Sequence, residues 1–198
     1  MILRQKRFDN GALSVHSIKL AFETTEENVP VDVTVYELKE SNRLIEEFML
    51  LANMSVAKQI FEFFPEQALL RRQEEPMERR MADFIQRMKK IGLDLDASSA
   101  GALQASMDAI QDPDVRKVIR LLALKPMQRS KYFCGGMLPA NKHHHYTMNA
   151  PLYTHFTSPI RRYADIIVHR LLEASLTGGE LQDVVTATHV GSILPFVD

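Results

Sequence analysis

The chain has 198 residues, of which 45% are hydrophobic and 25% charged, and its formal net charge at pH 7 is −1. These values are typical of one globular domain with a real core, and they exclude a disordered or collagen-like chain. No apolar run approaches the roughly 20 residues that cross a bilayer, and no apolar signal segment follows Met1, so we expect no membrane contact.

Two strands joined by a hairpin are predicted near the start of the chain. In residues 13–22 and in residues 30–38, apolar side chains alternate with polar or small ones. This alternation predicts two strands, each with one buried face. The acidic stretch from Glu23 to Pro30 is predicted to be the loop that joins them.

From Ser41 the apolar period changes to that of a helix, which Pro65 must end. The apolar stripe consists of Leu44, Ile45, Phe48, Leu51, Ala52, Ser55, Val56 and Ile60. The sequence therefore predicts one long helix that is mostly buried.

Three shorter helices are predicted in the centre of the chain. The first covers 77–91 and ends at Gly92. The second covers 98–110, with Ser98 as the expected N-cap. The third covers 113–124, because a proline at its start suits the first helical turn.

The region after the third helix, 125–157, contains prolines and a Gly-Gly pair, which indicates irregular loops and short strands. A further helix is predicted from Ser158 to about Ser175. Thr157 or Ser158 can cap this helix, and the proline that follows can occupy its first turn. A short final helix is predicted over 180–188.

Positive charge is concentrated in residues 115–172, which contain ten basic residues and Asp165 as the single acid. The rest of the chain carries fourteen basic and twenty-four acidic side chains. A locally basic segment can line the path of a polyanion, since phosphate contacts need Lys and Arg locally. The alternative is an ordinary solvated face that nearby acids compensate.

Arg161 and Arg162 are the leading candidates for an anion site. Both are predicted to lie in the first turn of the 158–175 helix, where free N–H groups and the helix dipole favour an anion. Two guanidiniums there would form a phosphate clamp. The alternative is a solvated ladder of ion pairs that continues through Asp165, His169 and Glu173 at four-residue spacing.

Aromatic side chains are interleaved with these cations at Tyr132, Phe133, Tyr153, His155 and Phe156. Single-stranded nucleic acid is bound by this combination, because bases stack on rings while cations follow the backbone. Burial in the core is the alternative for each ring taken alone.

No metal or nucleophile site is predicted from the remaining polar residues. The consecutive histidines 143–145 cannot easily converge on one ion, and Asp94 and Asp96 precede a helix start that they can cap. The one cysteine, Cys134, excludes an internal disulfide and is expected to be a small buried hydrophobe. A single cysteine fits a reducing compartment, the cytoplasm or the nucleus.

Several segments resemble consecutive signatures of the RNase II/RNB family of 3′-to-5′ exoribonucleases. They are LIEEFMLLANMSVAKQIF (44–61), QALLRRQEEP (67–76) and YTHFTSPIRRYADIIVHRLL (153–172). The stretches DASSAGAL (96–103) and KPMQRSKYFC (125–134) resemble the eukaryotic branch of that family.

The resemblance implies a partial RNB domain over 1–176, followed by a C-terminal extension over 177–198. The fold that it implies is mixed α/β, the helix-rich C-terminal part of an RNB catalytic domain with a small antiparallel β portion near the N-terminus.

The resemblance also implies a function, the processive and magnesium-dependent hydrolysis of single-stranded RNA from its 3′ end to nucleoside monophosphates. Arg161 in SPIRRY matches the arginine at the 3′-terminal phosphate, and Glu47 in IEEFM matches a glutamate near the terminal nucleotides. Arg162, His155 and Tyr163 complete the expected RNA-binding set.

By the same resemblance, the aspartates that bind magnesium belong to a part of the domain upstream of this chain. We therefore expect this chain alone to bind no Mg²⁺ and to hydrolyse no RNA. The segment GALQASMDAIQD (101–112) resembles fungal members that bind RNA without cleaving it. A fragment of an inactive RNA-binding regulator is thus the alternative, and an intact or a substituted upstream aspartate cluster distinguishes the two.

Overall fold

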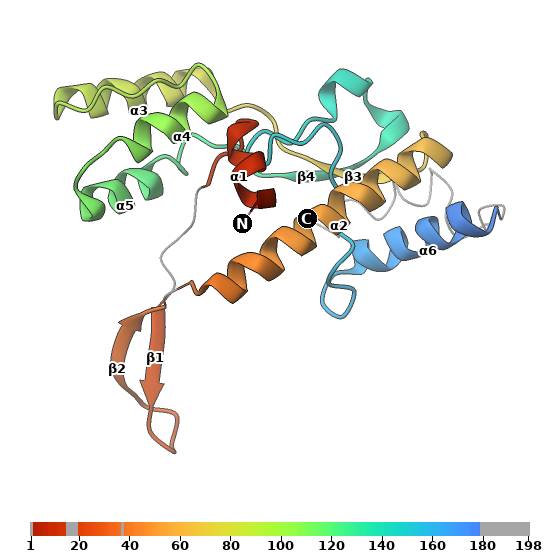
Figure 1. Cartoon of the computed structure of the whole chain (residues 1–198), viewed down its shortest axis with the longest axis horizontal. Helices are drawn as coiled ribbons and strands as arrows, with labels where there is room; N and C mark the ends of the chain where they lie inside the picture. Colours follow the sequence, from red (N-terminus) through yellow and green to blue (C-terminus); the bar gives the residue numbers. More distant parts are fainter. Residues whose placement is uncertain (1, 15–19, 37, 179–198) are drawn as a thin grey trace.

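The computed structural model describes residues 2–14, 20–36 and 38–178 (Figure 1). Within these ranges the chain begins with α1 (Ile2–Asp9) and combines six α-helices with two two-stranded antiparallel sheets. The expected mixed, helix-rich α/β fold is confirmed. Among the described residues, no helix is both long and apolar enough to cross a membrane.

The predicted hairpin is confirmed as β1 (Leu20–Thr24) and β2 (Pro30–Val35), although 15–19 lie outside the described residues. The predicted burial of one face is wrong, because Phe22 is 59% exposed and Val31 64%. The hairpin projects away from the rest of the molecule, so no layer of described residues covers either face (Figure 1).

The long predicted helix is confirmed as α2 (Glu40–Phe63), but its predicted stripe is wrong in the first half. Leu44, Ile45 and Phe48 are each more than half exposed there. The buried side of that half is instead the one that carries Leu50, which packs against Ala150 and Tyr153. The contacts of the helix, and not its hydrophobicity alone, decide which face is buried.

The main core lies where α2 and α6 (Tyr163–Thr177) pack with β3 (Leu69–Arg72) and β4 (Lys131–Cys134). The two strands are antiparallel, with Leu69 opposite Cys134. The largest fully buried side chains of this core include Ile60, Leu69, Leu70, Val168 and Leu171.

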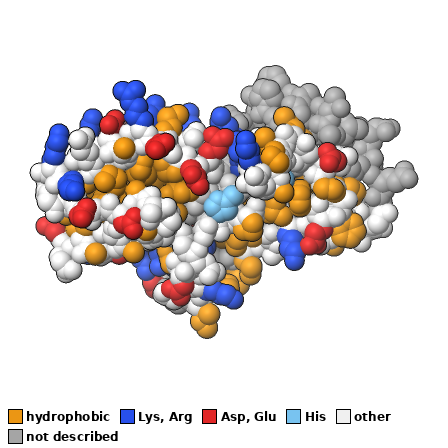
Figure 2. All heavy atoms as spheres, turned by 90° about the horizontal axis from the view of Figure 1, so that it is seen from above, with side chains coloured by type: hydrophobic (Ala, Val, Ile, Leu, Met, Phe, Trp, Pro, Cys, Tyr) orange, Lys and Arg blue, Asp and Glu red, His pale blue; other side chains and the backbone are white. Residues whose placement is uncertain are grey.

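A second core is formed by α3 (Glu78–Lys90), α4 (Ala100–Asp108) and α5 (Pro113–Leu122). The three predicted helices are confirmed, with Gly92 at φ +82° just beyond α3 and a proline in the first turn of α5. Seen from above, hydrophobic side chains are visible over this part of the molecule within a border of charged ones (Figure 2).

The predicted N-cap of α4 is one residue too early. Ser99 caps the helix, because its Oγ accepts a hydrogen bond from Ala102 N at 3.0 Å. The N–H of Ser98 donates instead to Asp96 Oδ1 at 2.8 Å, which holds Ser98 in a turn outside the helix.

The predicted irregular region contains β4 and two short 3₁₀ turns, η1 (Gly135–Met137) and η2 (Ala140–Lys142). The start predicted for the last helix is wrong, since α6 begins at Tyr163 and Arg162 is its N-cap. The carbonyl of Ser158 accepts hydrogen bonds from the N–H groups of Arg161 and Arg162, at 3.2 and 3.1 Å. These bonds close a turn before the helix; the helix predicted over 180–188 lies outside the described residues.

Candidate functional site

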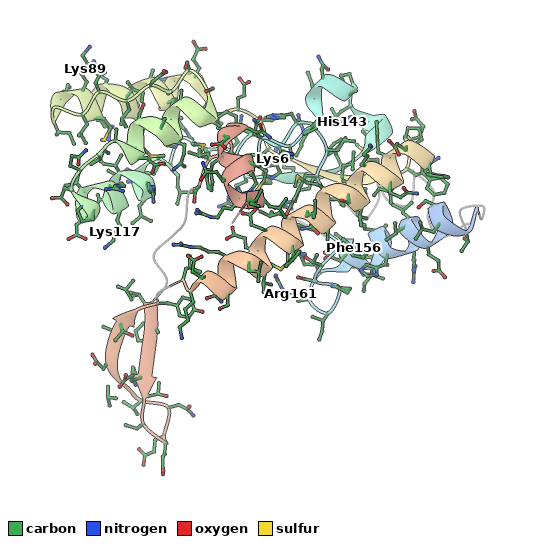
Figure 3. The ribbon with its side chains drawn as sticks, viewed as in Figure 1. Lys6, Lys89, Lys117, His143, Phe156 and Arg161 are labelled. Atoms are coloured by element: carbon green, nitrogen blue, oxygen red, sulfur yellow. The ribbon has the colours of Figure 1, made fainter. Side chains whose placement is uncertain are left out.

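The turn before α6 places its two arginines in different environments. Arg162 forms a bidentate pair with Asp165, with Nε 2.7 Å from Oδ2 and Nη2 2.8 Å from Oδ1. Arg161 is exposed and projects from the loop that precedes α6, with Nη2 3.5 Å from Ser158 Oγ (Figure 3). The prediction that both lie in the first turn of the helix is therefore wrong, and they do not form a symmetric clamp.

Asp165 fixes this turn from inside the protein. Its side chain is completely buried, and Oδ1 also accepts the N–H of Ser158 at 2.7 Å. The carboxylate thus accepts three hydrogen bonds, two of them from the guanidinium of Arg162, and this pairing compensates its buried charge. Asp165 therefore holds both ends of the turn that carries Arg161.

A cavity of about 890 Å³ opens beside Arg161. Its cations come from three separate stretches of chain and are Arg71, Arg129, Lys131, Arg161 and Arg162. Tyr132, His155 and Tyr163 line it as well, and no Asp or Glu is among the described residues at its wall. We call it the Arg161 cavity; four of the five predicted site residues meet in it.

His155, which lines the Arg161 cavity, belongs to the segment 153–156, which β3 holds in place. Tyr153 O accepts the N–H of Arg71 at 2.7 Å, and Thr154 Oγ1 donates to Leu69 O at 2.6 Å. The segment therefore lies beside β3 as a strand would.

The same segment is tied to α2 and α6. Asn53, buried on α2, donates from Nδ2 to Tyr153 Oη and accepts the N–H of Phe156 at Oδ1, both at 3.0 Å. On the other side, His169 of α6 stacks on Phe156 with ring centroids 4.2 Å apart. These contacts fix the position of His155, which lies between the anchored residues.

The rings in the Arg161 cavity are held by hydrogen bonds and by a cation. The guanidinium of Arg71 lies over the Tyr132 ring, 4.5 Å from its centroid. The hydroxyl of Tyr132 is hydrogen-bonded to His155 Nδ1. Burial, followed by the charges of Arg162 and Arg71, lowers the pKa of His155 to about 3. His155 is therefore neutral near pH 7, and the positive charge of the cavity comes from its Arg and Lys side chains.

Glu47, the fifth predicted site residue, does not line the Arg161 cavity. It is buried on α2, and its carboxylate pairs with Arg7 of α1 at 2.6 Å. The structure thus uses this carboxylate to join α1 to α2.

Sequence reasoning missed three of the cavity cations. Arg129 and Lys131 were counted only as charge in the basic segment, and Arg71 lay outside that segment in the QALLRRQEEP motif. Strand β3 brings Arg71 to the cavity by pairing it with Tyr132 of β4. Only this long-range strand pairing brings Arg71 near Tyr132, so no local sequence signal reveals that Arg71 belongs to the cavity.

The remaining candidates from the sequence do not converge. His143, His144 and His145 direct Nε2 to Leu138 O, Asn149 Oδ1 and Ser130 Oγ respectively. Across the described ranges, no three His, Cys, Asp or Glu side chains gather to hold a metal ion. Burial raises the pKa of the Cys134 thiol to about 11.

Comparison with known proteins gives consistent matches. The model of the RNB domain family matches residues 1–178. DIS3-like exonuclease 2 of Caenorhabditis elegans is 48% identical over 189 residues, which are 93% of this chain and 22% of that protein. The chain spans about a fifth of the length of the curated relatives it matches.

Two solved structures share the fold. Yeast Ssd1, described as a pseudonuclease, superposes with a TM-score of 0.74 at 34% identity, over 79% of this chain and 19% of Ssd1. Mycoplasma genitalium RNase R, in complex with ribose-methylated single-stranded RNA, superposes with a TM-score of 0.80 at 21% identity. That match covers 98% of this chain and 30% of RNase R, and at this identity it shows the fold alone.

Proposed function

The chain belongs to the RNB domain family, and from this premise we propose that it is the single-stranded-RNA-binding part of a 3′-to-5′ exoribonuclease. The observation that carries the proposal is the Arg161 cavity, where five cations and three rings meet without a carboxylate among the described lining residues. Phosphates are attracted by such a charge, and bases stack on such rings.

The proposal assigns different tasks to the two arginines of the turn. Arg161 is exposed and has no carboxylate partner among the described residues, so its guanidinium can make a bidentate contact with a phosphate. Arg162 keeps its contact with Asp165 and adds charge to the wall from a fixed position. In this proposal Arg161 contacts the phosphate near the 3′ end of the RNA.

The proposal covers RNA binding by this chain, with hydrolysis to nucleoside monophosphates as the reaction of the complete family domain. Among the described residues no three His, Cys, Asp or Glu side chains gather to hold a metal ion, and the proposed RNA contacts are made by Arg, Lys and aromatic side chains. We expect the purified chain to bind single-stranded RNA and to release no nucleotides from it when Mg²⁺ is added. Degradation from a labelled 3′ end by this material would overturn that expectation.

Measurement of RNA affinity tests the proposal. Fluorescence anisotropy with a labelled oligouridine compares the unmodified chain with Arg161→Ala and with Arg170→Ala. We expect Arg161→Ala to weaken binding about ten- to hundredfold, the loss of one charged hydrogen-bonding group. Arg170 is exposed on α6 outside the cavity, so its variant is the matched control and should bind as the unmodified chain does. Equal affinities in all three proteins would remove Arg161 from the site.

The similarity to Ssd1 favours a second candidate, part of an RNA-binding protein that does not cleave. Both candidates require RNA binding in the Arg161 cavity, and they differ in hydrolysis. The two candidates are distinguished by incubating the native protein that contains this chain with 3′-labelled RNA and Mg²⁺. Release of nucleoside monophosphates supports the exoribonuclease, and binding without release supports the inactive regulator.

A further inference from the structure

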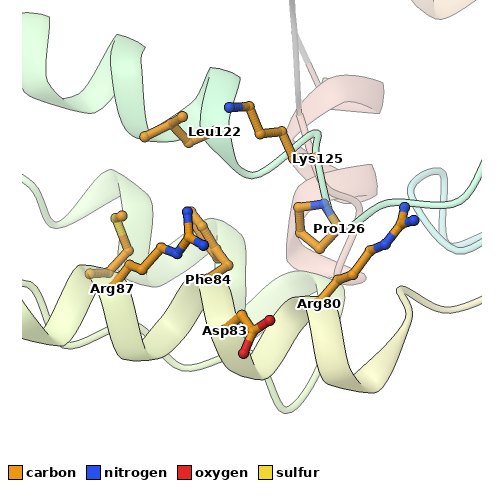
Figure 4. Close-up of a pocket in the computed structure, with 8 residues that line it drawn as sticks. Arg80, Asp83, Phe84, Arg87, Leu122, Lys125 and Pro126 are labelled. Atoms are coloured by element: carbon orange, nitrogen blue, oxygen red, sulfur yellow. The ribbon is translucent and has the colours of Figure 1, made fainter.

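A second basic cavity lies between α3 and the end of α5. Its volume is about 360 Å³, and Arg80 and Arg87 of α3 reach it from one side while Lys125 reaches it from the other (Figure 4). Asp83 is the one acidic residue among the described residues that line it. We call it the Arg80 groove, defined by these four residues with Phe84 and Pro126.

The spacing along α3 explains how the groove forms. Arg80, Phe84 and Arg87 are separated by four and three residues, so they lie on one face of the helix. Phe84 is buried in the second core and fixes that face against the rest of the protein. The two arginines therefore flank Phe84, whose burial fixes the rotation of this face of the helix.

The cations of the groove have no partners in the part of the chain that the structure describes. Arg80, Arg87 and Lys125 make no side-chain hydrogen bond or ion pair with another described residue. Other cations nearby are paired, since Lys117 contacts Asp114 at 3.0 Å and Arg120 contacts Asp108. With three cations and the single acid Asp83 at its wall, the groove therefore presents net positive charge to a ligand from outside.

Part of the groove wall is apolar, because Phe84 and Pro126, both largely buried, line it between the cations. A small inorganic anion gains nothing from such a surface. A nucleotide unit fits it better, because the sugar and base can contact the apolar surface while phosphates contact the cations.

Residues that are neighbours in the sequence line the groove and the Arg161 cavity. Lys125 and Pro126 line the groove, and their neighbours Leu124 and Met127 line the cavity. One short segment thus forms a wall of both, and Arg129, exposed farther along it, adds a cation on the cavity side.

We propose that the Arg80 groove is a second binding site for single-stranded RNA, occupied by nucleotides on the 5′ side of those in the Arg161 cavity. This inference rests on the proposed function, because it takes the 3′ end to lie in the Arg161 cavity. In this proposal, RNA that is long enough to leave the cavity and cross the 124–127 segment makes an additional contact in the groove.

The test is the dependence of affinity on RNA length. Oligouridines of increasing length are titrated against the chain, against Arg80→Gln/Arg87→Gln and against Arg79→Gln/Lys90→Gln. The last variant removes the same charge from the same helix, at exposed positions that line neither cavity. Thermal melting verifies that all three proteins are folded.

We expect the groove variant to bind trinucleotides like the unmodified chain and to bind long oligonucleotides about tenfold more weakly. Its slope of log affinity against log salt for long RNA should also fall by about 1.4, since each lost phosphate contact contributes about 0.7. The control variant should follow the unmodified chain at every length. Lys125→Gln should produce a smaller loss that is likewise confined to long RNA.

Two results would overturn the second site. One is a groove variant that behaves like the control at every length, and the other is an equal loss at all lengths, which would indicate a general effect of charge. The Arg161→Ala variant separates this failure from that of the proposed function. If the cavity is the primary site, Arg161→Ala weakens binding of trinucleotides and long RNA alike, whatever the groove variant does.

Discussion

The guanidinium of Arg162 and the carboxylate of Asp165 face each other in a bidentate pair in which Asp165 is completely buried and the Arg162 side chain is 20% exposed. Because Arg162 is held in this way, Arg161 is the arginine of the turn that remains exposed beside the cavity. The pair is therefore a structural element as well as a source of charge.

Replacing the buried carboxylate tests this role. Asp165→Ala should lower the free energy of unfolding by about 3–5 kcal/mol, because it leaves a mostly buried guanidinium without its partner and Ser158 N–H without its acceptor. Urea denaturation measures the change. Glu40→Ala removes one partner of an exposed pair with Arg43 and should cost less than about 1 kcal/mol. Similar losses in both variants would contradict the structural role of Asp165.

The stability of the chain should depend on pH through His145. Burial, followed by the charges of Arg71 and His144, lowers the pKa of His145 from 6.5 to about 4. At a pH between about 4 and 6.5, His145 is protonated in the unfolded chain and neutral in the folded chain. The free energy of unfolding should therefore fall as the pH falls from 6.5 towards 4, by about 1.4 kcal/mol per pH unit from this group.

Urea denaturation at pH 7, 6 and 5 measures this dependence. The slope in this range should be clearly reduced in His145→Gln and changed much less in His144→Gln, because burial is the largest cause of the lowered His145 pKa and the exposed His144 contributes less than burial and Arg71. A pH dependence that is the same in His145→Gln as in the unmodified chain would show that another group is responsible.

The hairpin should be nearly independent of the main core in its energetics. Phe22→Thr and Val31→Thr alter exposed side chains, so each should change the free energy of unfolding by less than about 0.5 kcal/mol. Leu70→Ala, in the main core, should cost about 2–5 kcal/mol. Urea denaturation compares the three variants, and a large loss from either hairpin substitution would mean that this surface is buried in solution.

Local patterns predicted most of the elements correctly. Gly92, Pro113 and Pro65 mark real ends or starts of helices, because each acts on the backbone at its own position. The predictions that failed depended on contacts with distant residues. The exposed side of α2 carries Phe48 because Tyr153, a hundred residues away, packs on the opposite side.

The candidate site was predictable only in part for the same reason. The sequence identified Arg161 and its basic surroundings, but it placed Arg161 inside the helix. The turn exists because Asp165 binds the N–H of Ser158, and a four-residue spacing of charges does not distinguish this bond from an ordinary ion pair on the helix surface. Glu47 and Arg71 required tertiary contacts to assign, with α1 and with β4 respectively.

The convergence of five cations in the Arg161 cavity has an energetic consequence. Arg71 comes from β3, Arg129 from the segment before β4, Lys131 from β4 itself, and Arg161 and Arg162 from the turn before α6. These three groups of charges are far apart in the sequence. Folding must bring them together against their mutual repulsion. A polyanion bound in the cavity, as proposed, would offset that repulsion, and because it would bind the assembled cavity more tightly than the unfolded chain, it should raise the melting temperature by mass action. Under the proposed function, nucleic acid would therefore stabilise the native state of the chain that binds it.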